Sequence, residues 1–289
     1  MINCEKKTIG KNLVIGKNVK ITCDELVIGN DVIIGDNTRI FAHGMFKIGN
    51  LSTLGSNTII KGNNISFGSE FFGTGRLEVG GGGWSNPESN LVIKDRCVMH
   101  NNHININCPV TIGNHVGLSP NVELITHGYW QSFLKGFPFR EGPITINDNA
   151  IIGRNSSILP NINIGESAVI GAGSVVSKDI LPFHVVGGVP AKTIYVINPD
   201  NMDIKEKEQL AQKVIDEYRN SLSFRQIDGV DINLEFPKVY LDEAVFDLET
   251  ETFKVKEHSE LTDDFRDFMR RKGVWFYGRR FKSIMRMKK

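Results

Sequence analysis

One histidine, His127, lies where the regular repeat of the sequence is interrupted. An aliphatic residue recurs every six residues along much of the chain, but the gap between Leu124 and Ile146 is 22 residues, which is not a multiple of six. His127 lies at the start of this gap, and segment 127–143 must leave the repeat as a loop. Loops on a rigid scaffold often carry function. A neutral imidazole, with an ordinary pKa near 6.5, can take a proton near neutral pH. The alternative is a loop histidine without a role.

The six-residue repeat organises the first two thirds of the chain. The longest uninterrupted series is Ile146, Ile152, Ile158, Ile164, Ile170 and Val176. The same spacing recurs in the triplets Ile9, Ile15, Ile21; Ile28, Ile34, Ile40; Ile48, Leu54, Ile60; and Ile112, Leu118, Leu124. A period of six fits neither an α-helix nor a simple alternating strand. A β-sandwich is disfavoured because its strands return every 8–12 residues.

A chain that turns a corner every six residues explains this period. Three short strands then make a triangular coil of about 18 residues, and coils must stack because one coil cannot bury its interior. Asn and Gly fall where the corners are expected, and both tolerate the positive φ that tight corners need. The predicted corner pairs are Lys11-Asn12, Asp36-Asn37, Ser56-Asn57, Asp148-Asn149 and Arg154-Asn155.

The repeat is broken in two places, which we predict to be loops: residues 66–91 and residues 127–143. The first break surrounds a run of four glycines, Gly80–Gly83, followed by Trp84. This run does not predict a phosphate-binding loop, because no Gly-Lys-Ser/Thr follows it.

The block from Val110 to Ile194 carries a specific order of motifs. A VTIG coil is followed by His127, a PITI return strand, an ILP step, IGAGSVV, a K-D-I-x-P segment and G-x-P-A-K. This order resembles the acetyl-CoA-dependent sugar and antibiotic acetyltransferases of the hexapeptide-repeat family. The resemblance implies a left-handed parallel β-helix, acetyl-CoA as co-substrate and a C3 homotrimer.

The resemblance also implies roles for individual residues. His127 matches the catalytic histidine, and Asn101 matches an asparagine that helps to hold the acceptor. The backbone amide of Arg154 matches the donor that stabilises the thioester oxyanion. The residues that match positions along the coenzyme are Gly153, Ala172, Lys178 and Lys192. The family often has Trp where this chain has Ile151, which leaves the pantetheine wall undefined.

The acceptor side is expected to involve aromatic and amide side chains. Tyr129 and Trp130 on the second loop can stack on sugar rings, or can pack against a neighbouring subunit. Trp84 and Asn102 are the other candidate acceptor contacts.

A second region follows the repeats. We predict a β-helix domain over residues 1–198 and a C-terminal α+β domain over residues 199–289. The latter should contain a helix over 203–222 capped by Asp203, short strands over 228–256 and a helix over 260–272. Its last residues form a basic tail that is either solvated or in contact with an anionic surface: Arg279, Arg280, Lys282, Arg286, Lys288 and Lys289.

Bulk properties exclude several classes of protein. The formal net charge of +1 indicates no nucleic-acid partner, and no apolar run is long enough for a membrane span. The N-terminus lacks an apolar signal core, which predicts a cytoplasmic location. The cysteines Cys4, Cys23, Cys97 and Cys108 form no CxxC pair and are predicted to be reduced packing residues.

The sequence thus predicts an O-acetyltransferase that acts on a sugar hydroxyl of a surface polysaccharide or its precursor. The alternative is an N-acetyltransferase of a nucleotide-linked amino sugar. A zinc hydratase on the same helix would need three converging histidines, and only His100 and His103 are close in sequence. No metal is therefore expected. A non-catalytic scaffold is disfavoured because His127 and both lysines are present.

Overall fold

The computed structural model describes residues 1–81, 86–129 and 131–278. The chain divides into two compact units, residues 1–197 and residues 198–289. The predicted acceptor contacts Trp84 and Trp130, and the basic tail from Arg279 onward, lie outside the described residues.

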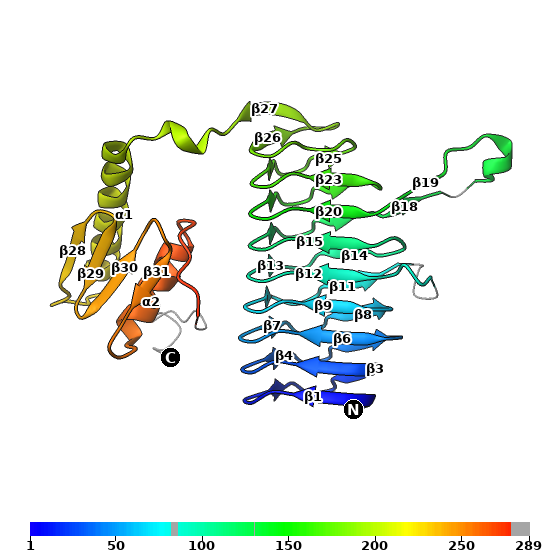
Figure 1. Ribbon diagram of the computed structural model, residues 1–289, viewed down its shortest axis with the longest axis horizontal. Helices are drawn as coiled ribbons and strands as arrows, with labels where there is room; N and C mark the ends of the chain where they lie inside the picture. Colours follow the sequence, from blue (N-terminus) through cyan, green and yellow to red (C-terminus); the bar gives the residue numbers. More distant parts are fainter. Residues whose placement is uncertain (82–85, 130, 279–289) are drawn as a thin grey trace. The chain divides into compact units, whose positions relative to one another are not determined.

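The first unit is a stack of coils with three flat faces (Figure 1). The first face is a sheet of β2 (Val14–Ile15), β4 (Ile33–Ile34), β7 (Thr53–Leu54), β10 (Phe72–Gly73), β13 (Val98–Met99), β16 (Gly117–Leu118), β21 (Ile151–Ile152), β24 (Val169–Ile170), β26 (His184–Gly187) and β27 (Lys192–Val196). Its pairings are parallel until β27 turns back against β26.

The second and third faces are joined at the N-terminal end by two long strands, β1 (Ile2–Ile9) and β3 (Lys20–Ile28). The second face continues from β3 through β5 (Arg39–Ala42), β8 (Ile59–Gly62), β11 (Glu78–Gly80), β14 (His103–Asn105), β17 (Glu123–Leu124), β22 (Ser157–Ile158) and β25 (Val175–Val176). The third face continues from β3 through β6 (Met45–Ile48), β9 (Ile65–Phe67), β12 (Leu91–Ile93), β15 (Val110–Ile112), β20 (Ile144–Ile146) and β23 (Ile162–Ile164).

We call the corner that follows each face the first, second or third corner. Asn37, Asn57 and Asn155 at the first corner have φ of 57–58°, as predicted from residue type. Their amides form a ladder between coils, for example Asn37 Nδ2 to Asn57 Oδ1 at 3.2 Å. Asn12 and Asn149 turn the third corner with φ of 57° and 61°. The predicted corner positions are therefore confirmed.

The six-residue frame of aliphatic residues forms the core of the coil stack. The series from Ile146 to Val176 is at most 1% exposed. Ile9 and Ile15 are exceptions, at 45% and 40% exposure, because the first coil has a neighbour on one side only. The predicted fold class, mainly β with a parallel β-helix and a C-terminal α+β appendage, is confirmed.

Coil length varies along the stack. Ile152 pairs with Ile170, 18 residues later, as the repeat predicts, whereas Ile34 pairs with Leu54, 20 residues later. The N-terminal coils therefore carry one or two extra residues at a corner.

The break at residues 66–91 is narrower than the sequence predicted. Strands β9, β10 and β11 lie inside it and keep the inward frame at Phe67, Gly73 and Val79. Gly73 offers no side chain to the core. The ring of Phe71, two residues earlier, fills the space beside it, about 3.0 Å from where a Cβ would lie. Among the described residues of this break, residue 81 and residues 86–90 lie outside the strands of the coil.

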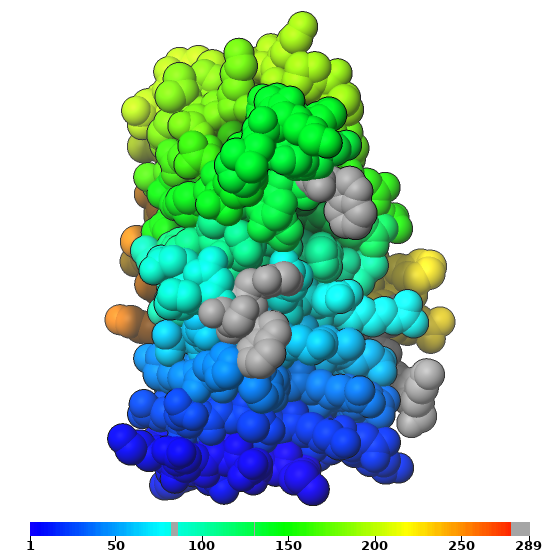
Figure 2. Space-filling model, turned by 90° about the vertical axis from the view of Figure 1, so that its right-hand side faces the viewer, coloured from blue at the N-terminus to red at the C-terminus, as the bar shows by residue number. Residues whose placement is uncertain are grey.

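The excursion at residues 127–143 projects from the second corner (Figures 1 and 2). Its base is a two-stranded antiparallel ribbon of β18 (His127–Gly128) and β19 (Arg140–Glu141), and its tip holds the 3₁₀ helix η1 (Phe133–Lys135). A regular ribbon thus holds His127 at the surface of the coil stack.

The second unit has its own architecture. After η2 (Pro199–Asn201), helix α1 (Ile204–Phe224) is followed by a four-stranded antiparallel sheet and helix α2 (Glu260–Arg270). The sheet contains β28 (Ile232–Glu235), β29 (Lys238–Leu241), β30 (Ala244–Asp247) and β31 (Thr252–Lys254). Both predicted helices are confirmed, and Asp203 caps α1 in a capping box with Glu206. None of the helices in the described ranges is long and apolar enough to span a membrane.

Candidate active site

His127 is held by an asparagine from the coil below. Its Nδ1 lies 3.0 Å from Oδ1 of Asn105, the last residue of β14. His127 is half-buried, whereas Asn105 is only 7% exposed. The opposite nitrogen, Nε2, forms no hydrogen bond with the described residues and is the part of the ring that can meet a substrate.

The amide of Asn105 is fixed on both sides. Its Nδ2 donates to the carbonyl of Gly81 at 2.6 Å, and its Oδ1 accepts from the hydroxyl of Thr126 at 2.5 Å. Oδ1 also accepts from the backbone N–H of Asn107 at 3.1 Å. Neighbouring coils therefore hold the amide in one orientation.

An aromatic stack extends from His127 along the excursion. The rings of His127 and Tyr129 have centroids 5.1 Å apart, and Tyr129 stacks on Phe139 at 4.6 Å with an interplanar angle of 18°. Tyr129 is 44% exposed and Phe139 is 51% exposed. Apolar ring faces are thus available to a ligand or a protein surface next to the imidazole.

A groove of about 570 Å³ lies between the base of the excursion and the two following coils. It is lined by Phe139, Arg140, Glu141, Pro160, Asn161, Ile162, Ser177, Lys178 and Asp179. Two cationic side chains, Arg140 and Lys178, face this groove together with two carboxylates. The predicted coenzyme contact Lys178 thus shares the second corner with His127.

The other predicted coenzyme contacts lie at the first corner. Gly153 and Arg154 follow β21, and Ala172 occupies the equivalent corner one coil later. Lys192 begins β27 opposite Gly187, at the same end of the first face. Arg154 and His127 are therefore at opposite ends of the second face. At about 3.3 Å per residue, the six residues from Asn121, below Asn155, to His127 span roughly 20 Å.

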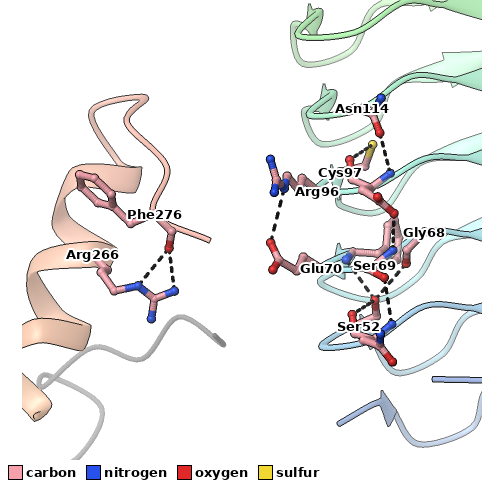
Figure 3. Close-up of polar contacts among 12 residues, drawn as sticks. Ser52, Gly68, Ser69, Glu70, Arg96, Cys97, Asn114, Arg266 and Phe276 are labelled. Carbon is pink, nitrogen blue, oxygen red and sulfur yellow. Dashed lines mark hydrogen bonds and ion pairs between the residues drawn. The ribbon is translucent and has the colours of Figure 1, made fainter. Parts of the chain in front are cut away.

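The backbone amide of Arg154 has no side-chain acceptor in the next coil, unlike the equivalent amides of the N-terminal coils. At the first corner of the N-terminal coils, a side chain of the next coil accepts from this amide: Asp36 from Lys17 at 2.7 Å, and Ser56 from Asp36 at 3.1 Å. Figure 3 shows the equivalent ladder at the third corner, where Ser69 and Asn114 take part. In the coil after Arg154, the equivalent residue is Ala172, whose side chain cannot accept a hydrogen bond. Within the described ranges, the N–H of Arg154 donates no hydrogen bond.

The structure does not bring Asn101 or Asn102 to His127. Asn101 donates to Asn121 in the exposed ladder of the first corner. Asn102 is 1% exposed, and its amide bonds the backbone of His100 and Ser119 at 2.7 Å each. Both side chains stabilise the corner, and Asn105 is the asparagine beside the imidazole.

The remaining candidate groups, His100 and the cysteines, form contacts within the coil stack. His100 Nδ1 lies 3.1 Å from the hydroxyl of Thr74, and burial lowers its pKa. Cys97 is buried and donates to the carbonyl of Gly113 at 3.0 Å. All four cysteines are free thiols, as predicted. Within residues 1–81, 86–129 and 131–278, no three His, Cys, Asp or Glu side chains form a metal-binding group.

Sequence reasoning missed Asn105 and Thr126. Asn105 lies 22 residues before His127, and only the coil pairing brings the two side chains together. One signal was present: Asn105 and Asn107 are amides in a stretch of alternating apolar residues that turns a corner. The pattern alone does not show which of these amides meets the histidine.

A family model described as bacterial transferase hexapeptide (six repeats) matches residues 143–178. The galactoside O-acetyltransferase of Escherichia coli (strain K12) is 44% identical over 91 residues. This match covers 31% of the present chain and 45% of that protein, so the chain spans about half the length of this relative.

Two solved structures extend the comparison. The UDP-N-acetylglucosamine acyltransferase from Campylobacter jejuni has a TM-score of 0.53 and 20% identity, covering 79% of this chain and 90% of that one. A maltose O-acetyltransferase from Clostridium difficile 630 is 29% identical over 47% of this chain and 66% of its own, with a TM-score of 0.30. The first of these shares the β-helix fold.

Proposed function

This chain is a hexapeptide-repeat protein of the bacterial transferase type, and on that premise we propose that it transfers an acetyl group from acetyl-CoA to a sugar hydroxyl, with His127 as general base. The observation that carries the proposal is the hydrogen bond from the His127 ring to Asn105 at 3.0 Å. It orients the imidazole and leaves Nε2 available for a proton.

The chemistry needs one base and no covalent intermediate. Nε2 of His127 takes the proton of the acceptor hydroxyl while the oxygen attacks the thioester carbonyl. The carbon–sulfur bond of the resulting tetrahedral adduct then breaks. The coenzyme thiolate leaves and takes the proton back from the imidazolium. Neutral imidazole suits the first step near neutral pH.

The tetrahedral adduct carries a negative oxygen that needs a fixed donor. The backbone N–H of Arg154 is a candidate, because Ala172 offers no side-chain acceptor where Asp36 and Ser56 cap equivalent amides. A preorganised donor of this kind typically contributes a factor of about 10²–10³ to kcat. The small Ala172 also permits the coenzyme arm to approach the corner closely.

One copy of the chain separates these groups, so we propose that the active site forms between copies. His127 and Lys178 are at the second corner, whereas Gly153, Arg154 and Lys192 are at the first. A cyclic homotrimer would bring the second corner of one copy to the first corner of the next.

The outward surface of the first face supports such an assembly. One outward row of the strand register is mostly apolar, with Thr53 and Gly117 as its exceptions. It includes Val14, Phe72 and Ile151, which are 55%, 41% and 51% exposed. Exposed apolar rows of this kind typically mark protein interfaces.

The coenzyme is proposed to run along the groove at the second corner. Lys178 and Arg140 in the groove can meet phosphate oxygens, with Lys192 contributed by the neighbouring copy. On the acceptor side, the stacked rings of Tyr129 and Phe139 can pack against the apolar face of a sugar.

Release of free thiol from acetyl-CoA tests the proposal across sugars, nucleotide sugars and polysaccharide fragments. We expect turnover with a hydroxyl acceptor and a product that mild alkali cleaves. His127→Ala should lower kcat at least about 10²-fold, because general-base catalysis contributes about 10²–10⁴-fold. His43→Ala, outside the site, is the matched control.

The outcomes separate the alternatives. A product that resists mild alkali would contain an amide bond and not an ester bond. That result would favour an amino-sugar acceptor. Full activity of folded His127→Ala would reject His127 as the base. Sedimentation equilibrium of the wild-type chain tests the trimer independently, and a stable monomer with full activity would contradict a site between copies.

A further inference from the structure

The orientation of the Asn105 amide can be assigned from its partners alone. The carbonyl of Gly81 can only accept, so the atom 2.6 Å from it must be the amide nitrogen. The backbone N–H of Asn107 can only donate, so the atom 3.1 Å from it must be the amide oxygen. Two independent groups on opposite sides thus give the same answer.

Thr126 adds a third constraint. Its hydroxyl is fully buried and accepts from the backbone N–H of Cys108 at 3.2 Å. Its own proton therefore points to Oδ1 of Asn105, 2.5 Å away. The carbonyl of Thr126 accepts from Gly142 N at 3.0 Å, which ties the same residue to the returning strand of the excursion.

We propose that Asn105, held by Thr126, is a positioning residue that selects the Nδ1–H tautomer of His127 and so keeps the lone pair on Nε2. Because Oδ1 is an acceptor, the ring nitrogen 3.0 Å from it must carry a proton. The catalytic role of this tautomer rests on the proposed function. The tautomer itself is a property of the resting protein.

The partner is a neutral amide, and this has a chemical consequence. A carboxylate at this position would favour the imidazolium, whereas an amide does so much less. The titratable groups on the surrounding elements include Tyr129, Arg140 and Glu141 of the excursion, and His103 and Cys108 of the coil below. Glu141 faces His127 across the ribbon, but no ion pair between them is formed within the described ranges.

The direct test is ¹⁵N NMR of the full chain labelled in its histidines, with His127→Ala to assign the signal. In neutral His127 we expect a protonated Nδ1 and an unprotonated Nε2. In Asn105→Ala this preference should be lost, with Nε2–H gaining population. Asn147→Ala is the matched control, because it also removes an amide that donates to a backbone carbonyl, Ile164 O at 2.7 Å.

Kinetics give the second readout. Asn105→Ala and Thr126→Val should lower kcat by roughly 10²-fold and 10-fold, respectively, with the KM for acetyl-CoA nearly unchanged. Thr58→Val, which removes an equally buried hydroxyl, should keep its kcat.

Asn105→Asp distinguishes positioning from simple loss of structure. The carboxylate still accepts from Nδ1 but stabilises the imidazolium, so the pKa of His127 should rise. Since the base must be neutral, the acid limb of the rate profile should move to higher pH by about one unit, and kcat should recover above it.

The proposal is overturned if wild-type His127 carries its proton on Nε2, or if Asn105→Ala leaves the tautomer unchanged. A wild-type protein with the expected tautomer but no acetyl transfer to any acceptor would refute the proposed function instead. The two failures are therefore distinguishable.

Discussion

At the residue scale, buried hydroxyl and thiol groups stabilise the corners by donating to backbone carbonyls. Ser52 Oγ lies 3.1 Å from the carbonyl of Gly68, and Ser174 Oγ lies 2.6 Å from that of Gly171. Cys97 takes the same place beside Gly113, with a thiol in place of the hydroxyl (Figure 3). Packing and this hydrogen bond are sufficient to explain the position of the Cys97 side chain.

This environment predicts low reactivity of the Cys97 thiol. Burial raises its pKa to about 12, so at pH 8 the thiolate fraction should be about 10³-fold below that of a free cysteine. We expect iodoacetamide to modify Cys108, which is only partly buried, much faster than Cys97 in the native protein. Mass spectrometry of alkylated peptides measures both. Unfolding in urea is the control, where all four cysteines should react alike.

Residue type predicted the corners but not the partners that hold His127. Asn37, Asn57 and Asn155 were predictable because positive φ is a local requirement that asparagine meets at low cost. The contact between Asn105 and His127 depends on stacking of separate coils, and no local rule encodes it. The family resemblance pointed to Asn101, which the structure assigns to the corner ladder instead.

At the element scale, stacking depends on glycines where one coil lies against the backbone of the next. A Cβ on Gly35 would lie 2.4 Å from the backbone nitrogen of Ser56. A Cβ on Gly117, in β16 on the outward first face, would meet nothing within 4 Å. Neither glycine has a positive φ. The two positions therefore differ in the room available for an added Cβ, and not in backbone strain.

Gly35→Ala should destabilise the coil stack by about 2–3 kcal/mol, because overpacking against backbone forces neighbouring coils apart. Gly117→Ala should be neutral within about 0.5 kcal/mol. Thermal unfolding followed by circular dichroism compares the two. Equal melting temperatures for both variants would contradict the close contact at Gly35.

The coil at residues 66–80 shows why an element escaped prediction. The inward frame continues through Phe67, Gly73 and Val79, but its middle member is a glycine and the pattern of aliphatic residues lapses there. Phe71 supplies the missing volume from a position outside the frame. A periodic sequence pattern identifies core side chains only at a fixed spacing. It does not identify an aromatic ring that fills the core from a position two residues outside that spacing.

At the scale of the whole molecule, the chain has two separate hydrophobic cores. One is the interior of the coils, and the other contains residues such as Tyr218, Phe246 and Phe265. The two compact units meet after residue 197, where the six-residue repeat has ended and before helical periodicity begins. Units with their own cores can unfold separately.

The second unit contains a largely buried ion pair between Arg225 and Asp264. Asp264 is fully buried and accepts two hydrogen bonds from Arg225, at 2.8 and 2.9 Å, and one from Tyr218 at 3.1 Å. Hydrogen bonding to Asp264 raises the pKa of Arg225. A largely buried guanidinium that loses its carboxylate leaves a charge without compensation, which typically costs about 3 kcal/mol or more.

Asp264→Asn should therefore lower the stability of residues 198–289 by about 3 kcal/mol and leave the coil stack unchanged. Calorimetry of the full chain should show two transitions, with only one displaced to lower temperature. Gly35→Ala identifies the other transition, because that substitution acts inside the coils. Asp216→Asn is the control: its pair with Arg219 is exposed, so a change below about 0.5 kcal/mol is expected. If Asp264→Asn displaced both transitions together, the two units would share one cooperative unfolding step, and the separate cores would not be thermodynamically independent.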